Sequence, residues 1–395
     1  MVRRVLHVTD VAPPGLGGIE TALATLIDAM PDVQVTLISP AHARGGDRKW
    51  GSNVTLRTIG AGNAVRRVVS AVVPPGKRKY VALASWLVDE WYRREVASAM
   101  EGDLVHLHSF AAFRYFANFR SRHPSRLSQS LVDWLRFFDG YGHPLLFTDH
   151  SLFGGSREQF DSIRNDLLLE RLTNVVCVER SGKANVDALA RERGLRVRAW
   201  WIPNPVDTER FRPAPLPSTD HLIVGYAGRY ERLGTDRVLR LAAEAPDWVE
   251  FRLAFAATED QIRNAGAEAG RTRATLSWNL PNAQMPEFYG SVHLFLDPWS
   301  FGAPRTSLEA LACGRVVIRL AGDGARSAEL PVDVSPIVDA SDPATFFQAL
   351  SKLRERSILE SLGRASRKLA EDTFSIREVA QAYRSVYLAV GGPAT

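Results

Sequence analysis

The sequence predicts an α/β protein of two domains, each with a parallel sheet covered by helices on both faces. Three observations predict this. Short apolar runs alternate with longer helix-like segments along the chain, the length of 395 residues suits two domains of ordinary size, and one proline-rich segment divides the alternation. Hydrophobic residues make up 45% and charged residues 24% of the chain, an ordinary composition for a soluble globular protein.

In the first half, short apolar runs have the length of strands, and longer segments between them have the length of helices. Strands are expected at residues 5–8, 33–38, 54–58, 104–108, 145–148 and 175–178. Helices are expected at residues 19–30, 81–100, 160–172 and 181–193.

The second half continues the same alternation after a proline-rich joint. Five prolines between Pro203 and Pro217 exclude a strand or helix interior there and mark the domain boundary. Apolar residues at helical spacing also predict a last helix at 376–390, which needs a surface to cover. Strands are expected at residues 222–227, 251–255, 292–296 and 316–320, and helices at 236–244, 307–312 and 344–354.

Charge and cysteine content indicate the kind of partner and the cellular compartment of the protein. The net charge of +5 and the pI near 9.3 favour an anionic partner, such as a diphosphate, a nucleic acid or a lipid headgroup. Cys177 and Cys313 lie far apart and form neither a disulfide framework nor a metal-ligand pattern, which favours a reducing compartment. The start of the chain is expected to be a strand and not a signal peptide, and no window reaches the roughly 18 apolar residues of a membrane span. We therefore expect a cytoplasmic protein.

A glycine-rich turn follows the first expected strand and precedes the first expected helix. Gly17 and Gly18 would let backbone N–H groups approach a bound anion, and the helix start adds the positive end of its dipole. A plain structural turn is the alternative, because such turns are common in α/β proteins. Both interpretations stay open from this motif alone.

A second turn of this kind lies between residues 300 and 314. Pro304 stands near the expected helix start. Glu309 could accept hydrogen bonds from two ribose hydroxyls, or it could simply be a glutamate favoured by the helix dipole. Backbone N–H groups of the first turn could hold a diphosphate: Arg305, Thr306 and Ser307.

Several motifs occur in a fixed order along the chain. A glycine loop is followed by Asp-x-x-His-x-His, a Thr-Asp-His segment, Pro-Asn-Pro-Val-Asp, a Gly-Arg turn and a Leu-Glu-Ala-Leu-Ala-Cys-Gly helix, at residues 17–20, 103–108, 147–150, 202–211, 227–230 and 308–314. Any one match could be chance, but the ordered set resembles glycosyltransferase family 4, the large retaining group with the GT-B fold.

This resemblance implies two Rossmann-like domains that face each other across a cleft. Residues 1–203 would form the acceptor-binding domain and residues 204–375 the nucleotide-sugar-binding domain, with a last helix at about 376–391 crossing back to the first. His150 would lie at the reacting centre, with Arg229 at the diphosphate. The residues implied to bind the donor are Gly17, Gly18, Arg229, Arg232, Arg305, Thr306, Ser307 and Glu309.

The implied activity is retaining transfer of a glycosyl group from a nucleotide-diphosphate sugar, without a metal or another cofactor. Cleavage of a glycosyl-phosphate bond develops negative charge on the diphosphate, which cations and backbone N–H groups can stabilise. In such enzymes the departing phosphate is thought to accept the proton of the acceptor, so no protein nucleophile is expected. The two-carboxylate hydrolase scheme is the contrasting arrangement, and no pair of residues stands out for it.

Three departures from the family pattern fall in the donor domain. Leu233 stands where the family has a phosphate-contacting lysine, although Arg232 could supply the charge with different geometry. The Gly-x-Gly after the next strand is replaced at residues 255–257. Phe301 replaces the first glutamate of the Glu-x7-Glu motif, which lies beside the transferred sugar in the family. An unusual donor sugar, a relocated carboxylate such as Asp297, or lost catalysis would each explain this change.

Residues 109–146 are rich in aromatic side chains, which can pack against sugars and ring systems. A helical pair that fills core is the alternative for most of them. The acceptor is expected to be a small molecule such as a natural product or its precursor, or else a glycan or lipid. The residues expected to bind it are Glu20, Phe110, Phe113 and Tyr115.

Charge and sequence motifs also indicate whether a membrane or a nucleic acid is a partner. Basic pairs and triplets at 66–67 and 77–79 bracket an apolar stretch, which predicts either a weak peripheral membrane contact or a solvated loop. No zinc-finger, helix-turn-helix or RNA-binding signature occurs, so no nucleic-acid partner is expected. His106 and His108 lie on an expected buried strand and are taken as structural residues, not as metal ligands.

Two other functions compete with glycosyl transfer. A non-catalytic or atypical nucleotide-sugar-binding homologue is motivated by Phe301 and Leu233. A nucleotide-sugar epimerase of the same fold would need an acidic base at the sugar, which the sequence does not single out. No motif specifies the donor base, the donor sugar or the oligomeric state.

Overall fold

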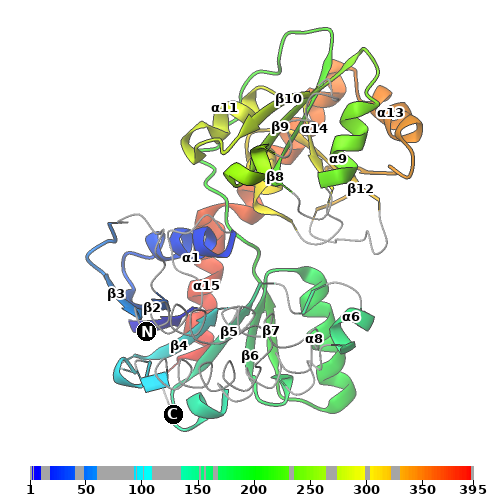
Figure 1. Cartoon of the computed structure of the whole chain (residues 1–395). Coiled ribbons are helices and arrows are strands. Elements are labelled where there is room, and N and C mark those ends of the chain that lie inside the picture. The colour runs from blue at the N-terminus through cyan, green and yellow to red at the C-terminus, as the bar shows by residue number, and fades with distance from the viewer. Residues whose placement is uncertain are drawn as a thin grey trace, which may run out of the picture. The chain divides into compact units, whose positions relative to one another are not determined.

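The structure is a computed structural model of two compact units (Figure 1). Unit 1 comprises residues 1–203 and 379–395, and unit 2 comprises residues 204–378. The structure describes residues 2, 4–9, 18–40, 49–59, 93–94, 96–100, 102–108, 135–150, 153–154, 157–162, 168–230, 235–263, 274–298, 303–321 and 330–392.

Unit 1 contains a seven-stranded parallel sheet with the strand order β3-β2-β1-β4-β5-β6-β7. Parallel strands must be joined by crossovers, and buried strands of this kind are continuous apolar runs. The strands are β1 (Arg4–Val8), β2 (Gln34–Pro40), β3 (Val54–Ile59), β4 (Leu104–His108), β5 (Leu145–Asp149), β6 (Asn174–Cys177) and β7 (Arg198–Trp201).

The two faces of this sheet carry different side chains. Leu6, Val105 and Phe147 belong to one apolar cluster, while Val5 and Leu104 belong to another on the opposite face, as the two-residue period of strands requires. The second cluster includes side chains of α1 (Gly18–Asp28) and of the C-terminal helix α15 (Ile376–Val390). The surface that the last helix needs is thus one face of the unit 1 sheet.

Unit 2 contains a six-stranded parallel sheet with the order β10-β9-β8-β11-β12-β13. This is the doubly wound order 3-2-1-4-5-6, and the first six strands of unit 1 follow the same order. The predicted fold class, α/β with two parallel sheets, is therefore confirmed. The strands are β8 (Leu222–Arg229), β9 (Val249–Ala256), β10 (Ala274–Trp278), β11 (Leu294–Asp297), β12 (Val316–Leu320) and β13 (Ile337–Val338).

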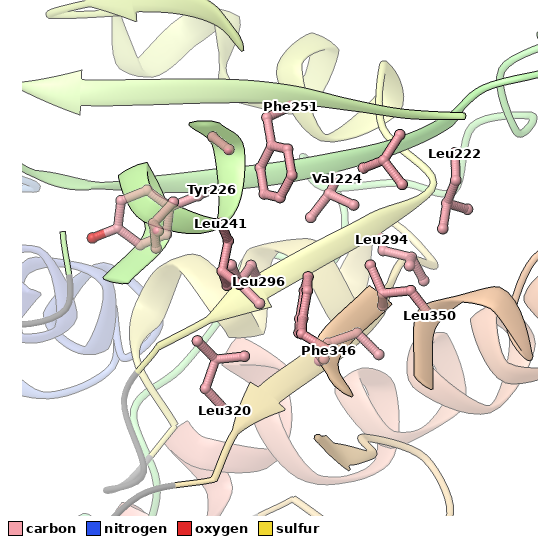
Figure 2. Packing of buried hydrophobic residues seen from close by; sticks show 14 of the residues in the cluster. Leu222, Val224, Tyr226, Leu241, Phe251, Leu294, Leu296, Leu320, Phe346 and Leu350 are labelled. Atoms are coloured by element: carbon pink, nitrogen blue, oxygen red, sulfur yellow. The ribbon is translucent and has the colours of Figure 1, made fainter. Parts of the chain in front are cut away.

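One core of unit 2 lies between its sheet and the helices α9 (Thr235–Ala243) and α13 (Pro343–Ser351). Figure 2 shows Val224 and Phe251 of neighbouring strands beside Leu241 of α9 and Phe346 of α13. Each fully buried side chain of this size contributes about 1.5–3 kcal/mol to folding. This packing fixes the sheet whose strand ends carry the candidate site.

Further helices complete the two units. Unit 1 has α6 (Arg157–Ser162) and α8 (Arg180–Arg193), and unit 2 has α11 (Met285–Gly290), α12 (Arg305–Ala312), α14 (Arg356–Leu369), the 3₁₀ turn η1 (Asn282–Gln284) and the π-helical turn η2 (Ala370–Phe374). The predicted helix at 81–100 lies mostly outside the described residues, although residues 96–98 are helical. The helix α14 and the strands β7, β10 and β13 were not predicted.

Candidate active site

Each sheet has one point at which the strand order reverses. It lies between β1 and β4 in unit 1 and between β8 and β11 in unit 2. In doubly wound sheets, ligands bind outside the carboxyl ends of the strands at this point. His108 is the last residue of β4, and Arg229 and Asp297 are the last residues of β8 and β11. Side chains that can carry chemistry therefore stand at both reversal points.

The helix α12 begins directly after the reversal point of unit 2. Pro304 precedes it in extended conformation, and its side chain offers no cap to the first-turn N–H groups. The N–H of Ser307 donates to the Pro304 carbonyl oxygen at 2.9 Å. The Ser307 N–H is therefore occupied in this structure, and the N–H groups of Arg305 and Thr306 are the ones that the helix start can offer to an anion.

Glu309 of α12 is almost fully buried and has two partners. The Tyr289 hydroxyl donates to its Oε2 at 2.9 Å, and Arg305 Nε pairs with its Oε1 at 2.8 Å. Burial raises the pKa of Glu309, and Arg305 and Tyr289 oppose that shift. A carboxylate has about four lone-pair positions, so about two remain for further donors. We call these three side chains the Glu309 cluster.

The two partners in the ion pair differ in accessibility. The Arg305 side chain is 25% exposed, whereas the Glu309 side chain is 5% exposed. Arg305 is therefore the partner that solvent or a ligand can reach, whereas Glu309 is covered. Burial and the negative charge of Glu309 raise the pKa of Tyr289, which keeps its hydroxyl protonated and donating.

Asp297 and Ser307 join the end of β11 to the first turn of α12. Both side chains are buried, and the Ser307 hydroxyl donates to Asp297 Oδ2 at 2.9 Å. Asp297 is the nearest carboxylate that could replace the glutamate for which Phe301 stands in this sequence. Its buried contact with Ser307 makes it an anchor of the helix start, which weakens that explanation.

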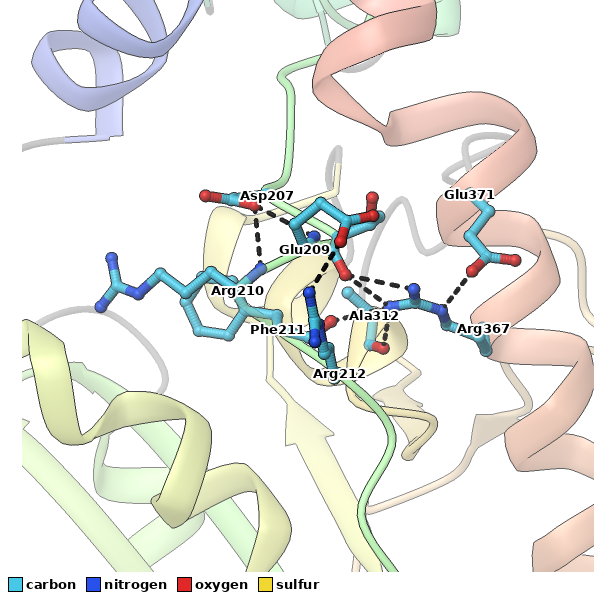
Figure 3. Close-up of polar contacts among 9 residues, drawn as sticks. Asp207, Glu209, Arg210, Phe211, Arg212, Ala312, Arg367 and Glu371 are labelled. Carbon is cyan, nitrogen blue, oxygen red and sulfur yellow. Dashed lines mark hydrogen bonds and ion pairs between the residues drawn. The ribbon is translucent and has the colours of Figure 1, made fainter.

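A half-buried guanidinium group holds the other end of α12. Arg367 of α14 donates to the carbonyl oxygens of Ala312 at 2.8 Å and Phe211 at 2.7 Å, as Figure 3 shows. It also donates to the Thr208 carbonyl oxygen and pairs with Glu371 at 2.6 Å. The last helical carbonyl groups lack partners within a helix, so this arginine supplies one.

Gly314 follows α12 with a φ of +68°, in the left-handed region that glycine adopts without strain. Behind it, Arg315 is fully buried and donates to the carbonyl oxygens of Tyr289, Gly290 and Ala214. Arg315 therefore fixes the end of α11, the helix that carries Tyr289. The Glu309 cluster stands on elements that are held by a buried arginine, Arg315, and a half-buried one, Arg367.

Unit 1 gathers a different set of side chains at its reversal point. His7 of β1 and His108 of β4 are fully buried, and His7 Nδ1 lies 2.9 Å from His108 Nε2. His108 Nδ1 lies 3.5 Å from Nε2 of His150, which follows β5. Burial lowers the pKa of His7 to about 3 and that of His150 to about 4. These imidazoles are therefore neutral near pH 7.

His106 lies among these imidazoles but has other partners. Its Nδ1 lies 2.9 Å from the Tyr387 hydroxyl and its Nε2 lies 2.7 Å from the Thr148 hydroxyl. Thr148 in turn contacts the hydroxyl of Tyr383 at 3.3 Å. His106 therefore ties β4 to β5 and to α15, which agrees with the structural role expected for it.

Three of these histidines could be considered as metal ligands. One ring nitrogen from each of His7, His106 and His108 lies within 4.8 Å of the other two. Two of these imidazoles already contact each other directly, because His7 Nδ1 lies 2.9 Å from His108 Nε2. A metal would also have to displace a hydroxyl from His106, so these residues fit a hydrogen-bonded network better.

The structure places some of the predicted site residues and leaves others undescribed. Glu20 lies half-buried in the first turn of α1, and Gly18 is the first residue of that helix. Arg229 is exposed, and its carbonyl oxygen accepts from the Thr235 hydroxyl at 3.2 Å. The residues outside the described ranges are Gly17, Phe110, Phe113, Tyr115, Arg232, Leu233 and Phe301, as is the basic segment 66–79.

Two residues of the site were missed by sequence reasoning. Tyr289 lies 20 residues before Glu309 on another helix, and no motif connects them. His7 stands on a strand that pairs in register with His106, so the two point to the same face. A comparison of alternating positions on the first and fourth strands could have found His7.

No helix among the described residues is both long and apolar enough to cross a membrane. A comparison with curated protein sequences finds no match. Residues 16–210 match the family model described as Glycosyltransferase Family 4.

Solved structures of the same fold span nearly the whole chain. Sucrose-phosphate synthase from Thermosynechococcus elongatus is 17% identical, with a TM-score of 0.69 over 98% of this chain and 100% of that one. The Anabaena protein Alr3699/HepE, solved with UDP and glucose, is 14% identical, with a TM-score of 0.65 over 98% and 100%. An Escherichia coli protein described as trehalose-6-phosphate, bound with UDP-2-fluoro glucose, is 13% identical, with a TM-score of 0.69 over 99% of each chain.

The matched motifs and the strand order of both sheets agree with these comparisons. The chain as a whole therefore has the GT-B fold, and its residues 16–210 belong to glycosyltransferase family 4.

Proposed function

We propose that this glycosyltransferase takes its sugar from a nucleoside-diphosphate sugar that unit 2 binds, and transfers it with retention of anomeric configuration. The observation that carries this proposal is the Glu309 cluster at the start of α12. There a carboxylate and a guanidinium group stand one helical turn apart, next to first-turn N–H groups. These are the groups that a ribose and a diphosphate require.

The proposed contacts divide the nucleotide between two side chains. Glu309 would accept from the ribose hydroxyls through the lone-pair positions that Tyr289 and Arg305 leave open. Arg305 would move from Glu309 to the diphosphate, where it would supply the positive charge that Leu233 does not. Arg229, exposed at the end of β8, would add a second positive charge.

The leaving group gains negative charge as the glycosyl bond breaks. In the proposed reaction, two arginines and the N–H groups of Arg305 and Thr306 stabilise that charge, and no metal is required. The departing phosphate would accept the proton of the acceptor hydroxyl, so that the new bond forms on the face that the nucleotide leaves. We expect cleavage of the donor to continue at full rate in the presence of a chelator.

The neutral histidines of unit 1 suit a sugar that carries no charge. We propose that His150 donates a hydrogen bond to the transferred sugar and that unit 1 binds the acceptor. A small molecule such as a natural product or its precursor is the acceptor that we favour. The two cysteines are buried free thiols, which is consistent with the cytoplasmic setting that we propose.

Two of the structural neighbours were solved with UDP or a UDP-sugar, which supports the choice of donor class. The test is a panel of nucleotide-sugars and nucleoside diphosphates added to the full chain. We expect at least one to raise the thermal midpoint, by the mass-action stabilisation of a bound ligand, and its sugar to be released slowly in the absence of acceptor. The absence of stabilisation by every member of the panel would contradict the nucleotide site.

Phe301 favours a second candidate, a binding protein without catalysis. This alternative predicts binding of a nucleotide-sugar with no release of its sugar, with or without acceptors. The same panel separates the two functions, because stabilisation reports binding and free nucleoside diphosphate reports cleavage.

A further inference from the structure

Three imidazoles of unit 1 form a chain from His7 through His108 to His150. The rings of His7 and His108 are nearly parallel, with an interplanar angle of 14° and centroids 5.1 Å apart. The rings of His108 and His150 are tilted by 30°, with centroids 5.8 Å apart. The inner contact of 2.9 Å is a normal hydrogen bond, and the outer contact of 3.5 Å is a long one.

The two ends of this chain have no hydrogen-bond partner among the described residues. At one end His7 Nε2 is buried and unpaired, and at the other end His150 Nδ1 is buried and unpaired. Most buried polar atoms in proteins have a partner, so each unpaired nitrogen calls for an explanation. An oxygen of a bound substrate can explain the unpaired nitrogen of His150.

The count of protons limits the chain to two arrangements. A neutral imidazole carries one N–H, and each of the two contacts needs one donor and one acceptor. In the first arrangement His7 Nδ1 donates to His108, and His108 Nδ1 donates to His150 Nε2. His150 then carries its proton on Nδ1. In the second arrangement every donor is reversed, and His150 Nδ1 becomes an acceptor while His7 Nε2 carries an unpaired proton.

The unpaired ends favour the first arrangement. It leaves an unused acceptor at His7, whereas the second arrangement leaves a buried N–H there that nothing satisfies. Orphaned buried N–H groups are rarer in proteins than acceptors with unused capacity. In the first arrangement the only unpaired donor is His150 Nδ1–H, and this donor can be satisfied by a substrate oxygen.

We propose that His108, supported by His7, is a positioning residue that fixes His150 in the tautomer with its proton on Nδ1. His150 then presents a hydrogen-bond donor to an oxygen of the transferred sugar. Only the identity of that oxygen rests on the proposed function, because the tautomer itself follows from the contacts within unit 1.

The test reads the tautomer of His150 by two-bond ¹H–¹⁵N correlation in the full chain labelled with ¹⁵N-histidine. The His150 signal is assigned by its loss in His150→Gln. We expect a protonated Nδ1 and an unprotonated Nε2 in the unsubstituted protein. A protonated Nε2 would overturn the proposal without the need for any further variant.

Two substitutions of His108 sharpen the test. The amide of His108→Asn can still donate from the position of Nδ1, so the His150 tautomer should be retained, whereas His108→Leu should give a mixture of both tautomers. Thr148→Val is the matched control, because it alters the contacts of His106 and leaves the contacts among His7, His108 and His150 intact. An unchanged His150 signal in a folded His108→Leu protein would contradict the role of His108.

Kinetics separate positioning from a merely structural effect. We expect His108→Leu to lower the rate constant for donor cleavage about tenfold and His108→Asn to recover most of it, with nucleoside-diphosphate affinity unchanged in both. Equal rates in the two variants would contradict positioning through the donor atom. If the unsubstituted protein cleaves no donor, the proposed function fails, and the tautomer measurement still decides the inference on its own.

Discussion

The two units place buried polar clusters at equivalent points of the same sheet topology, but the clusters have opposite electrostatic character. In unit 1 the reversal point carries neutral imidazoles, because burial lowers the pKa values of His7, His108 and His150. In unit 2 it carries an ion pair between Arg305 and Glu309. One topology therefore supports an uncharged hydrogen-bonding surface and a charged one.

This difference follows from how each cluster is compensated. A buried charge needs a partner, and Glu309 has Arg305 and Tyr289. Buried imidazoles can avoid charge altogether by releasing a proton, which leaves them as hydrogen-bonding groups. This contrast supports the proposal that unit 2 binds the anionic part of a substrate and unit 1 its uncharged part.

The largest expected effect is on stability below neutral pH. Histidine titrates near pH 6.5 in the unfolded chain, whereas His7 and His150 in the folded chain bind a proton only near pH 3 and 4. The unfolded state therefore binds more protons as the pH falls below 6.5, and stability is lost. Between pH 6.5 and 5.5 each histidine with such a lowered pKa removes about 1 kcal/mol from the free energy of unfolding. Unit 1 has four of them, His7, His106, His108 and His150, which together remove about 4 kcal/mol.

In unit 2, the pKa of His293 is lowered in the same direction, while the raised pKa of Glu309 acts in the opposite sense. Differential scanning calorimetry at pH 7.5, 6.5 and 5.5 checks the contrast. We expect the midpoint temperature of the unit 1 transition to fall more than that of the unit 2 transition. The unit 2 transition is identified as the one whose midpoint rises when a nucleoside diphosphate is bound. Equal shifts of both transitions would break the comparison between the units.

The next effect is on nucleotide affinity. Glu309→Ala removes the proposed ribose ligand, and hydrogen bonds to a charged group are worth about 1.5–3 kcal/mol, so affinity should fall about 10-fold to 100-fold. Isothermal titration calorimetry with the best nucleoside diphosphate of the panel measures it. Glu360→Ala is the control, because that exposed carboxylate pairs with an arginine four residues away on the same unit. Unchanged affinity in Glu309→Ala would remove its role at the ribose.

A smaller and more selective effect is expected from Arg305→Met. If Arg305 moves to the diphosphate, the affinity for the nucleoside diphosphate should fall about tenfold. Affinity for the nucleoside without phosphates should stay the same or rise, because Glu309 loses a competing partner. Arg356→Met removes an exposed pair of the same spacing, with Glu360, and serves as the control. Equal losses for both ligands would show that Arg305 only holds Glu309.

Sequence patterns were sufficient for the central strands and for β3, but not for the other three edge strands, β7, β10 and β13. The strands β1, β4, β8 and β11 are mostly apolar because both faces of a parallel sheet are covered, and histidines interrupt the apolar residues in β1 and β4. The strands β7 and β10 lie at the edges of their sheets and are only half-buried, so their sequences lack that run. Pairing partners, and not composition, make these two segments strands.

The site was predictable where its residues belong to one segment. Glu309 and Arg305 are four residues apart on one helix, and their motif follows a strand. The contact between Glu309 and Tyr289 depends on how α11 packs, and the contact between His7 and His108 joins residues 101 positions apart. Such contacts follow from sheet register and helix packing, which a single sequence does not specify.

The most direct test of the division between the two units compares two variants, His150→Ala and Glu309→Ala. Each is titrated calorimetrically with the nucleoside diphosphate, and its rate of donor cleavage is also measured. We predict that His150→Ala binds the nucleoside diphosphate as the unsubstituted protein does while its cleavage of the donor is largely lost. We predict that Glu309→Ala loses affinity for the same ligand. A fall in affinity in His150→Ala as large as that in Glu309→Ala, or undiminished cleavage by His150→Ala, would contradict the assignment.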